Sequence, residues 1–400
     1  VRGIKLTGIG KKGSQPVPRN IIDEIIYDLK TGQIPPVTQG AFFGSLMMKG
    51  LTADELGLED ALVPGVLQHP ADLVSYIAGD APEDIQAICV HLLEKKELDK
   101  GTATRLGKFM LSGLPGDGAR GLVVSILRVR YETMDEYEAL LKAAEETIEP
   151  PFRTSAPAGE PIIQIAEPFD GVDQSYMLTP LLGKFLQTLN YRVIHLVGRS
   201  SGPKLCFNLL DVIKEINLTC IHGNQDLSQP KPPYGFFIDQ EDLSKPLDRW
   251  VELRRQTVKR PFFATLEKFL NPAKARISLT SAYHPPYSEK MATIAERAGF
   301  PGSIVVRNGL EGSLAFPLKR PVKILCSARQ ADGSYKREEL TFDPADHLKT
   351  DIPFEEKLEN PTAADNARLI REFDQKGKTS NNYFNERARL SCAGLKIALE

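Results

Sequence analysis

Residues 161–186 read PIIQIAEPFDGVDQSYMLTPLLGKFL, and this stretch decides the class of fold. A short apolar run is followed by a loop and then by apolar residues at helical spacing, which predicts a strand, a loop and a helix. In α/β proteins, the loop after such a strand is a common place for a ligand. This loop has one glycine, Gly171, and carries Glu167, Pro168 and Phe169 where a phosphate would need bare backbone.

The alternation of strands and helices continues downstream. Further strands are predicted over 191–197, 235–239, 275–283 and 302–309, and helices over 178–189, 205–216, 263–270 and 288–298. This order predicts an α/β domain with a mostly parallel central sheet. Residues 321–343 predict a hairpin that turns at ADG, and residues 361–399 return to a helical pattern.

The region upstream, residues 20–150, is helical in pattern and contains an internal repeat. Residues 39–55 (QGAFFGSLMMKGLTADE) align without a gap on residues 120–136 (RGLVVSILRVRYETMDE). Each copy has an apolar helix that ends in a basic residue, followed by a threonine with a carboxylate three residues later. That pattern is a capping box, which predicts the start of another helix.

The proline-rich stretch 149–161 (EPPFRTSAPAGEP) is predicted to link two domains. We expect an all-helical domain over 1–150 and a larger α/β domain over 151–400. The helical domain is expected to contain repeat units at 16–60 and 97–148.

The composition excludes several classes of protein. The chain has 400 residues, of which 42% are hydrophobic and 26% charged, and its formal charge is −2, so any basic surface is local. No apolar run is long enough to cross a bilayer, and the first residues lack the apolar core of a secretory signal. The five cysteines show no CxxC spacing, which predicts reduced thiols in a cytoplasmic protein and no zinc site.

Five stretches together resemble the anthranilate phosphoribosyltransferase and nucleoside phosphorylase superfamily, also called glycosyltransferase family 3. They are QGAFFGSLMMKGLTADEL (39–56), IIQIAEPFDGVDQSYMLTPLLGKFL (162–186), RPFFATLEKFLNPAKARISLTSAYHP (260–285), IVVRNGLEGS (304–313) and PTAADNARLI (361–370). The opening IKLTGIGKKGSQPV (4–17) is most similar to an anthranilate-transferase-like branch that is distinct from the tryptophan-pathway enzyme. The expected assembly is a homodimer through the helical domain.

The resemblance implies that a GTGGD loop should hold the pyrophosphate of phosphoribosyl pyrophosphate after the first strand. Here AEPFD stands in that place and keeps Asp170, with Gly171 following. Proline removes an amide donor, and Glu167 would repel a polyanion. The next family motif opens a helix that can accept phosphate, and Thr179 retains a hydroxyl there.

A mobile KHGN loop of the family corresponds to HLVGR (195–199) and the SSGPK that follows, whereas IHGN (221–224) comes one helix too late and is interpreted as an ordinary loop. The arginine that binds the anthranilate carboxylate corresponds best to Arg254, although a solvated helix face is the simpler interpretation. No catalytic residue is assigned. The candidate ligand- or phosphate-binding residues are Asp170, Gly171, Thr179, Gly198, Arg199, Lys204 and Arg254.

The family holds magnesium with an adjacent Asp-Glu pair, and alignment of GLEGSLAF (309–316) places Leu314 and Ala315 at those positions. Glu311 is a lone carboxylate nearby. Aliphatic side chains cannot bind a hard cation, so we expect both magnesium and phosphoribosyl pyrophosphate to be lost as ligands.

Whether the chain is an enzyme is left open. The sequence favours an anthranilate phosphoribosyltransferase-like protein without that activity, which binds a phosphate-bearing ligand such as nucleic acid. The alternatives are an active pentosyltransferase or phosphorylase with an altered substrate, and a structural or regulatory dimer. Three basic stretches support nucleic-acid binding: 2–19, 254–260 and 368–396. Within them the candidate contacts are Lys11, Lys12, Arg19, Arg255 and Arg260.

Overall fold

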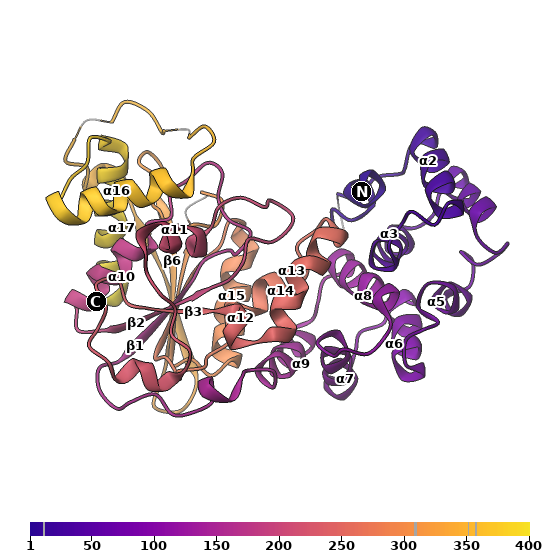
Figure 1. Cartoon of the computed structure of the whole chain (residues 1–400), viewed down its shortest axis with the longest axis horizontal. Helices are drawn as coiled ribbons and strands as arrows, with labels where there is room; N and C mark the ends of the chain where they lie inside the picture. Colours follow the sequence, from indigo (N-terminus) through magenta and orange to yellow (C-terminus); the bar gives the residue numbers. More distant parts are fainter. Residues whose placement is uncertain (11–12, 308–309, 351, 357) are drawn as a thin grey trace. The chain divides into compact units, whose positions relative to one another are not determined.

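A computed structural model describes residues 1–10, 13–307, 310–350, 352–356 and 358–400 (Figure 1). The chain divides into two compact units. A helical unit comprises Val1–Glu146 and Arg249–Leu266, and an α/β unit comprises Thr147–Asp248 and Glu267–Glu400. Among the described residues no helix is both long enough and apolar enough to span a bilayer.

Residues 249–266, which the sequence analysis placed with the α/β domain, group with the helical unit instead. The reason is a set of large side chains that are buried there. The indole N–H of Trp250 donates to the carbonyl of Met110 at 2.9 Å, and the Trp250 ring lies 4.8 Å from that of Phe263. A buried indole needs such an acceptor, and this one lies far away in the sequence.

The helical unit consists of short and medium helices. They are α1 (Arg2–Thr7), α2 (Arg19–Lys30), α3 (Pro36–Lys49), α4 (Ala53–Leu56), η1 (Gly57–Ala61), α5 (Pro70–Ala78), α6 (Glu83–Leu93), α7 (Lys100–Met110), α8 (Asp117–Arg130), α9 (Met134–Glu145) and α14 (Phe263–Leu266). Helix α13 (Lys245–Thr257) begins in the α/β unit and continues into the helical unit.

The first of the two predicted capping boxes is present at the start of α4. Thr52 accepts from the Glu55 amide, and the Glu55 side chain accepts from the Thr52 amide at 2.8 Å. Buried Glu55 also accepts from Lys49 at 2.8 Å and from the Val17 amide at 2.8 Å. Burial works to raise the pKa of Glu55, but these hydrogen bonds outweigh it and hold the pKa below its ordinary value.

The second copy repeats the arrangement bond for bond. Thr133 and Glu136 form the capping box of α9, and Arg130 lies 2.6 Å from the Glu136 carboxylate. The Leu98 amide donates to the same carboxylate at 3.0 Å, in the place that the Val17 amide takes in the first copy. In both copies one buried glutamate therefore joins the start of its own helix, the end of the preceding helix (α3 or α8) and the segment before the helix that comes earlier still (α2 or α7).

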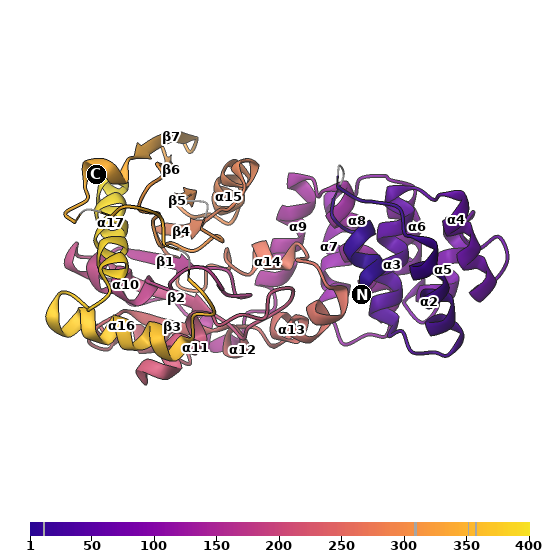
Figure 2. The same cartoon turned by 90° about the horizontal axis from the view of Figure 1, so that it is seen from above.

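Glycines bring α3 and α8 together, and the two helices lie side by side in Figures 1 and 2. A Cβ at Gly40 would stand 2.0 Å from the carbonyl oxygen of Gly118, and a Cβ at Gly121 would stand 2.1 Å from that of Val37. The two contacts are equivalent positions of the repeat. Only glycine allows backbones to approach so closely.

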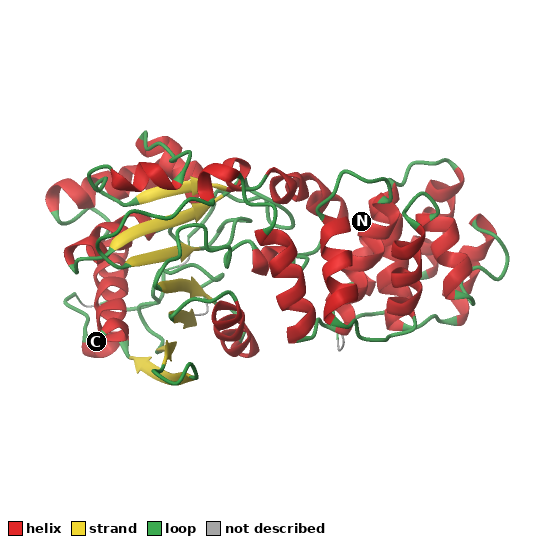
Figure 3. Ribbon diagram, turned by 90° about the horizontal axis from the view of Figure 1, so that it is seen from below, coloured by secondary structure: helices red, strands yellow, loops and turns green. Residues whose placement is uncertain are grey.

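The α/β unit contains a seven-stranded sheet in the order β3-β2-β1-β4-β5-β6-β7. The strands are β1 (Ile162–Ala166), β2 (Arg192–Val197), β3 (Phe236–Asp239), β4 (Ile277–Ser281), β5 (Gly302–Arg307), β6 (Val322–Arg329) and β7 (Tyr335–Phe342). The first five pair in parallel and the predicted hairpin adds β6 and β7 antiparallel. The expected mostly parallel sheet is confirmed, with helices on both of its faces (Figure 3).

The remaining elements cover the sheet. They are η2 (Pro150–Phe152), α10 (Thr179–Thr188), α11 (Leu209–Ile216), η3 (Asn224–Ser228), α12 (Gln240–Leu243), α15 (Pro285–Arg297), η4 (Pro344–Asp346), α16 (Ala363–Lys376) and α17 (Asn382–Leu399). Side chains of α10, α11, α16 and α17 join Ile163 and Ile165 in one apolar core, whereas α15 packs near β5 and β6.

Two predicted elements differ from the structure. The helix expected over 263–270 ends at Leu266, because the buried Gln164 amide takes the carbonyls of Lys268 (3.2 Å) and Leu270 (2.8 Å) as acceptors. The helix expected from residue 205 begins at Leu209, where Asn208 caps it. The end of the strand predicted over 302–309 lies outside the described residues.

Candidate functional site

Three loops of the α/β unit hold most of the predicted site residues. They follow the carboxyl ends of β1, β2 and β5 and comprise residues 167–178, 198–208 and 310–318. Parallel strands β2, β1, β4 and β5 are neighbours, so these ends lie at one edge of the sheet. This is where α/β proteins bind ligands.

Glu167 lies at the centre of this edge and is 2% exposed. One carboxylate oxygen accepts from the Leu314 amide at 2.6 Å, and the other accepts from the Thr179 hydroxyl. Burial raises the pKa of Glu167 to about 7, and the nearby Lys268 acts in the opposite direction. Thr179, predicted to bind a phosphate, therefore binds a carboxylate of the chain itself.

Phe169 and Gly198 close the space between the first two loops. A Cβ at Gly198 would stand 2.9 Å from the Phe169 ring, and the Asn208 side chain donates to the carbonyls of both residues at 2.8 Å. The cavity left among residues 167–169, 196–198 and 208–210 measures about 10 Å³. That is no more than one water molecule requires, so a phosphate does not fit.

Gly171 is required by packing against the chain that follows β2. Its φ is +83°, and a Cβ there would stand 2.3 Å from the carbonyl oxygen of Phe207. The Cys206 amide donates to the carbonyl of Asp170 at 3.3 Å, and the side chain of Asp170 is buried. Both predicted residues therefore hold loops together in this structure.

Lys204 is drawn into an ionic cluster with two carboxylates. Its ammonium group contacts Glu311 and lies 3.6 Å from Asp173. Glu311 also accepts from the amides of Asp173 (3.1 Å) and Gln174 (2.7 Å). Burial, together with a hydrogen bond from Asp173, raises the pKa of Glu311. The positive charge that the sequence assigned to a phosphate is thus neutralised internally.

Arg199 is also paired with a carboxylate of the chain. Two of its guanidinium nitrogens lie 3.0 and 2.7 Å from the two oxygens of Asp248. Such a paired contact is the geometry that arginine uses for external carboxylates and phosphates. Asp248 gave no signal in the sequence, since it lies far along the chain from Arg199.

The residues at the predicted metal position do not fit magnesium. Leu314 and Ala315 are both fully buried and apolar. The nearest carboxylates, Glu167 and Glu311, are occupied by the contacts above. Over the ranges that the structure describes, no three His, Cys, Asp or Glu side chains are grouped to share a metal ion.

His195 does not provide chemistry at this edge. His195 lies within β2, is fully buried, stacks on Phe237 and contacts the Tyr234 carbonyl at 2.8 Å. Burial lowers its pKa to about 4, so it is a neutral core residue at physiological pH. The IHGN segment is a loop, in which buried Asn224 donates to three carbonyls, including that of Phe152 at 3.0 Å.

Arg254 belongs to the helical unit and is 1% exposed. It does not present an accessible guanidinium. Arg19 pairs with Asp23 at 3.0 Å and Arg255 with Glu252 at 3.3 Å. The side chain of Arg260 is exposed to solvent. The other two nucleic-acid candidates, Lys11 and Lys12, lie outside the described residues.

Two of the basic stretches meet in the helical unit. The ammonium of Lys259 lies 3.5 Å from the Lys5 carbonyl, and its aliphatic chain packs beside Gly8. Burial lowers the pKa of Lys259, and the charges of Arg128 and Lys5 lower it further. Among the described residues neither Lys5 nor Lys259 has an ion-pair partner. We call Lys5, Arg128 and Lys259 the basic cluster.

The third basic stretch, 368–396, is balanced by acids. Arg387 is buried and pairs with Glu355 at 2.7 Å, so it is part of the protein interior. Further ion pairs there are Arg368–Asp365, Lys376–Glu372, Arg389–Glu386 and Lys396–Glu400. Five of the seven basic residues in this stretch therefore pair with acids among the described residues.

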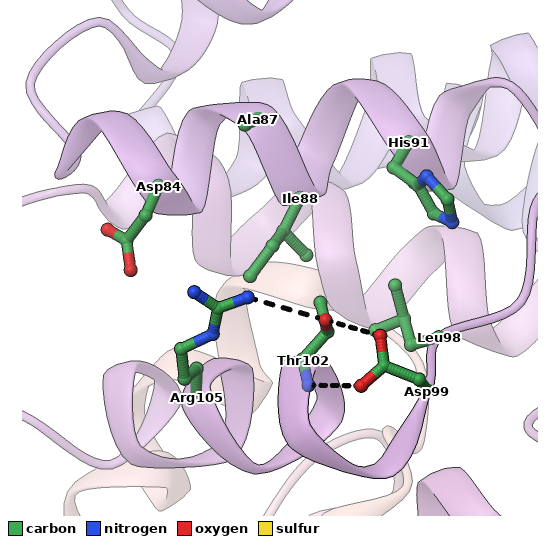
Figure 4. Close-up of a pocket in the computed structure, with 8 residues that line it drawn as sticks. All are labelled: Asp84, Ala87, Ile88, His91, Leu98, Asp99, Thr102 and Arg105. Carbon is green, nitrogen blue, oxygen red and sulfur yellow. Dashed lines mark hydrogen bonds between the residues drawn. The ribbon is translucent and has the colours of Figure 1, made fainter.

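A groove between α6 and α7 of the helical unit measures about 240 Å³ (Figure 4). Its floor is apolar, with Ile88 and Leu98. Three of its polar residues bind one another: Asp99 accepts from the amide and the hydroxyl of Thr102 at 3.0 and 2.7 Å, and Arg105 donates to Thr102 at 3.4 Å. These polar groups are therefore directed at each other rather than at a ligand.

Comparison with known proteins agrees with this geometry at the level of the fold. No family model matches the chain. It is 23% identical over 229 residues to an uncharacterized protein of Aquifex aeolicus, covering 57% of this chain and 68% of that protein. It is 25% identical over 226 residues to the uncharacterized protein YbiB of Escherichia coli K12, covering 55% and 67%.

Among solved structures, the anthranilate phosphoribosyltransferase (TrpD) of Thermus thermophilus superposes with a TM-score of 0.62 at 16% identity, covering 79% of this chain and 89% of that one. The Saccharomyces cerevisiae enzyme, in complex with PRPP and Mg, gives 0.60 at 12% identity, covering 78% and 88%. The chain therefore has the fold of anthranilate phosphoribosyltransferase, as its sequence indicates.

Proposed function

We propose that this chain, which has the fold of anthranilate phosphoribosyltransferase, binds nucleic acid through its helical unit and does not transfer phosphoribosyl groups to anthranilate. The basic cluster carries the first part of the proposal, because Lys5 and Lys259 lie together there without a neutralising carboxylate among the described residues. Such cations attract a polyanion, and the phosphate backbone is the commonest polyanion available to a protein. The basic stretch 2–19, which contains Lys5, also includes Lys11 and Lys12 in its sequence, and these two lie outside the described residues.

The filled edge of the sheet supports the second part of the proposal. The place for a pyrophosphate contains Glu167 and Phe169, the cations Lys204 and Arg199 are paired with carboxylates, and the metal position is aliphatic. Stabilising a leaving pyrophosphate requires donors or a metal ion free to receive its charge. The alternative of pentosyl transfer with an altered substrate meets the same obstacle.

Binding of a single-stranded oligonucleotide, followed by fluorescence anisotropy, is expected to be measurable at about 50 mM salt and to weaken steeply by about 200 mM. Replacing Lys5 and Lys259 together by glutamine should weaken it several-fold and reduce the slope of log affinity against log salt by roughly 0.7 for each phosphate that is no longer bound. The matched control replaces exposed Lys30 and Lys142, with the same change of charge in the same unit. Equal effects of the two double variants, or binding indifferent to salt, would refute the proposal.

Calorimetry with phosphoribosyl pyrophosphate is expected to show no saturable heat, with or without magnesium, because the cavity among residues 167–169, 196–198 and 208–210 measures only about 10 Å³ and Lys204 and Arg199 are paired with carboxylates. An anthranilate phosphoribosyltransferase in the same buffer is the positive control. A micromolar isotherm that depends on magnesium would establish the pentosyltransferase alternative instead. The predicted homodimer through the helical unit stays a prediction, with Tyr27 and Val63 among the exposed apolar side chains of that unit.

A further inference from the structure

The side chain of Glu167 is held as a bound anion would be. Its two oxygens accept from donors on separate loops, the Leu314 amide at 2.6 Å and the Thr179 hydroxyl. Thr179 is the first residue of α10, where unpaired amides favour negative charge. The ammonium of buried Lys268 acts on the same carboxylate. A hydroxyl and an amide thus converge on one group that is 2% exposed, and the charge of Lys268 favours its ionised form.

The groups that surround the Glu167 carboxylate come from parts of the chain that are far apart in the sequence. Thr179 begins the helix after β1, Leu314 follows β5, and Lys268 precedes β4. A carboxylate buried among apolar residues costs free energy unless several donors compensate. Because about 10 Å³ remains beside residues 167–169, the carboxylate and the phenylalanine fill the space completely.

We propose that the Leu314 amide, the Thr179 hydroxyl and Lys268 form a seat for a small oxyanion, and that Glu167 is an internal ligand that keeps this seat closed. The seat suits a carboxylate or a phosphate oxygen, since both are accepted by the same donors. Glu167 therefore keeps external oxyanions out of this seat. The inference goes beyond nucleic-acid binding, whose residues Lys5 and Lys259 lie in the helical unit, so either can fail without the other.

The test is chemical replacement of the missing carboxylate. Glu167→Ala leaves a cavity with unpaired donors, and formate or inorganic phosphate is expected to refill it. At constant ionic strength and pH 8, either anion should raise the midpoint of thermal unfolding of Glu167→Ala by roughly 3–8 °C, increasing with the logarithm of anion concentration. The wild type should not respond, because its seat is filled.

Two further variants distinguish stabilisation by anion binding at the seat from a general effect of salt. Glu167→Gln keeps the volume of the side chain, so it should show no response to formate. Leu182→Ala opens a cavity in the same apolar core without donors. If formate and phosphate stabilise Leu182→Ala as much as Glu167→Ala, the proposal is wrong.

A second measurement covers the case in which Glu167→Ala does not fold in chloride. The variant is then refolded from denaturant in formate and in chloride, in parallel with Leu182→Ala, and the yield of folded protein is compared. Recovery that requires formate and is confined to Glu167→Ala supports the seat. Equal yields in the two salts overturn it.

Discussion

Replacing Gly121 by valine is expected to destabilise the helical unit by about 3 kcal/mol or more, the largest effect we anticipate from one substitution. Even the Cβ of alanine would stand 2.1 Å from the carbonyl oxygen of Val37. That oxygen belongs to the backbone of α3, so the clash cannot be relieved by a change of rotamer. The helices must move apart, and the side chains along their interface then no longer pack. Hydrogen exchange of the α3 and α8 amides should accelerate accordingly.

The repeat supplies an internal check. Gly40→Val should cost about as much as Gly121→Val, because its Cβ would stand 2.0 Å from the Gly118 carbonyl oxygen in the equivalent contact. Gly113→Ala is the control, since nothing lies within 4 Å of a Cβ at that position. Unchanged exchange in both valine variants would mean that the helices do not pack through these glycines.

Glu167→Gln is expected to stabilise the protein at alkaline pH. Burial raises the pKa of Glu167 to about 7, whereas the unfolded chain has the ordinary value of 4.5. Between these values the folded state holds a proton that the unfolded state has lost, so stability falls as the pH rises through this window. Glutamine mimics the protonated acid. The variant should match the wild type near pH 4.5 and exceed it by up to about 3 kcal/mol above pH 8.

Urea denaturation at several pH values measures this difference. His195 contributes the opposite slope, because its pKa of about 4 lies below the ordinary 6.5 and stability is lost as the pH falls through that range. Both proteins retain His195, so subtracting one curve from the other removes its effect. A free-energy difference that does not grow with pH would show that Glu167 is ionised freely in the folded protein.

Much of the fold could be predicted because its signals are local. The strand at 162–166, the hairpin at 322–342 and both capping boxes follow from residues within a few positions of one another. The repeat is visible for the same reason: both copies keep the glycine, the basic residue, the threonine and the glutamate without a gap. Resemblance over several stretches then supported the assignment of the fold as a whole.

For the candidate site, the sequence predicted the location but not the groups that its residues contact. Gly171 and Gly198 are typical of phosphate loops, yet one is required by the Phe207 carbonyl and the other by the Phe169 ring. Lys204 meets Glu311, and Arg199 meets Asp248, from distant parts of the chain. Periodicity and motif spacing contain no information on such pairings, so charges that look available in the sequence are neutralised in the fold.

The division of the chain at residue 249 has a consequence for its synthesis. Helix α9 packs near α14, and Trp250 donates to Met110, so the helical unit cannot close until residue 266 has left the ribosome. Residues 147–248 must be made first, which takes roughly 5–20 s at usual rates of translation. During that interval the nascent helices present an open apolar face. Folding of the helical unit, whose residues 1–146 are translated first, can therefore be completed only after residues 249–266 have been synthesised.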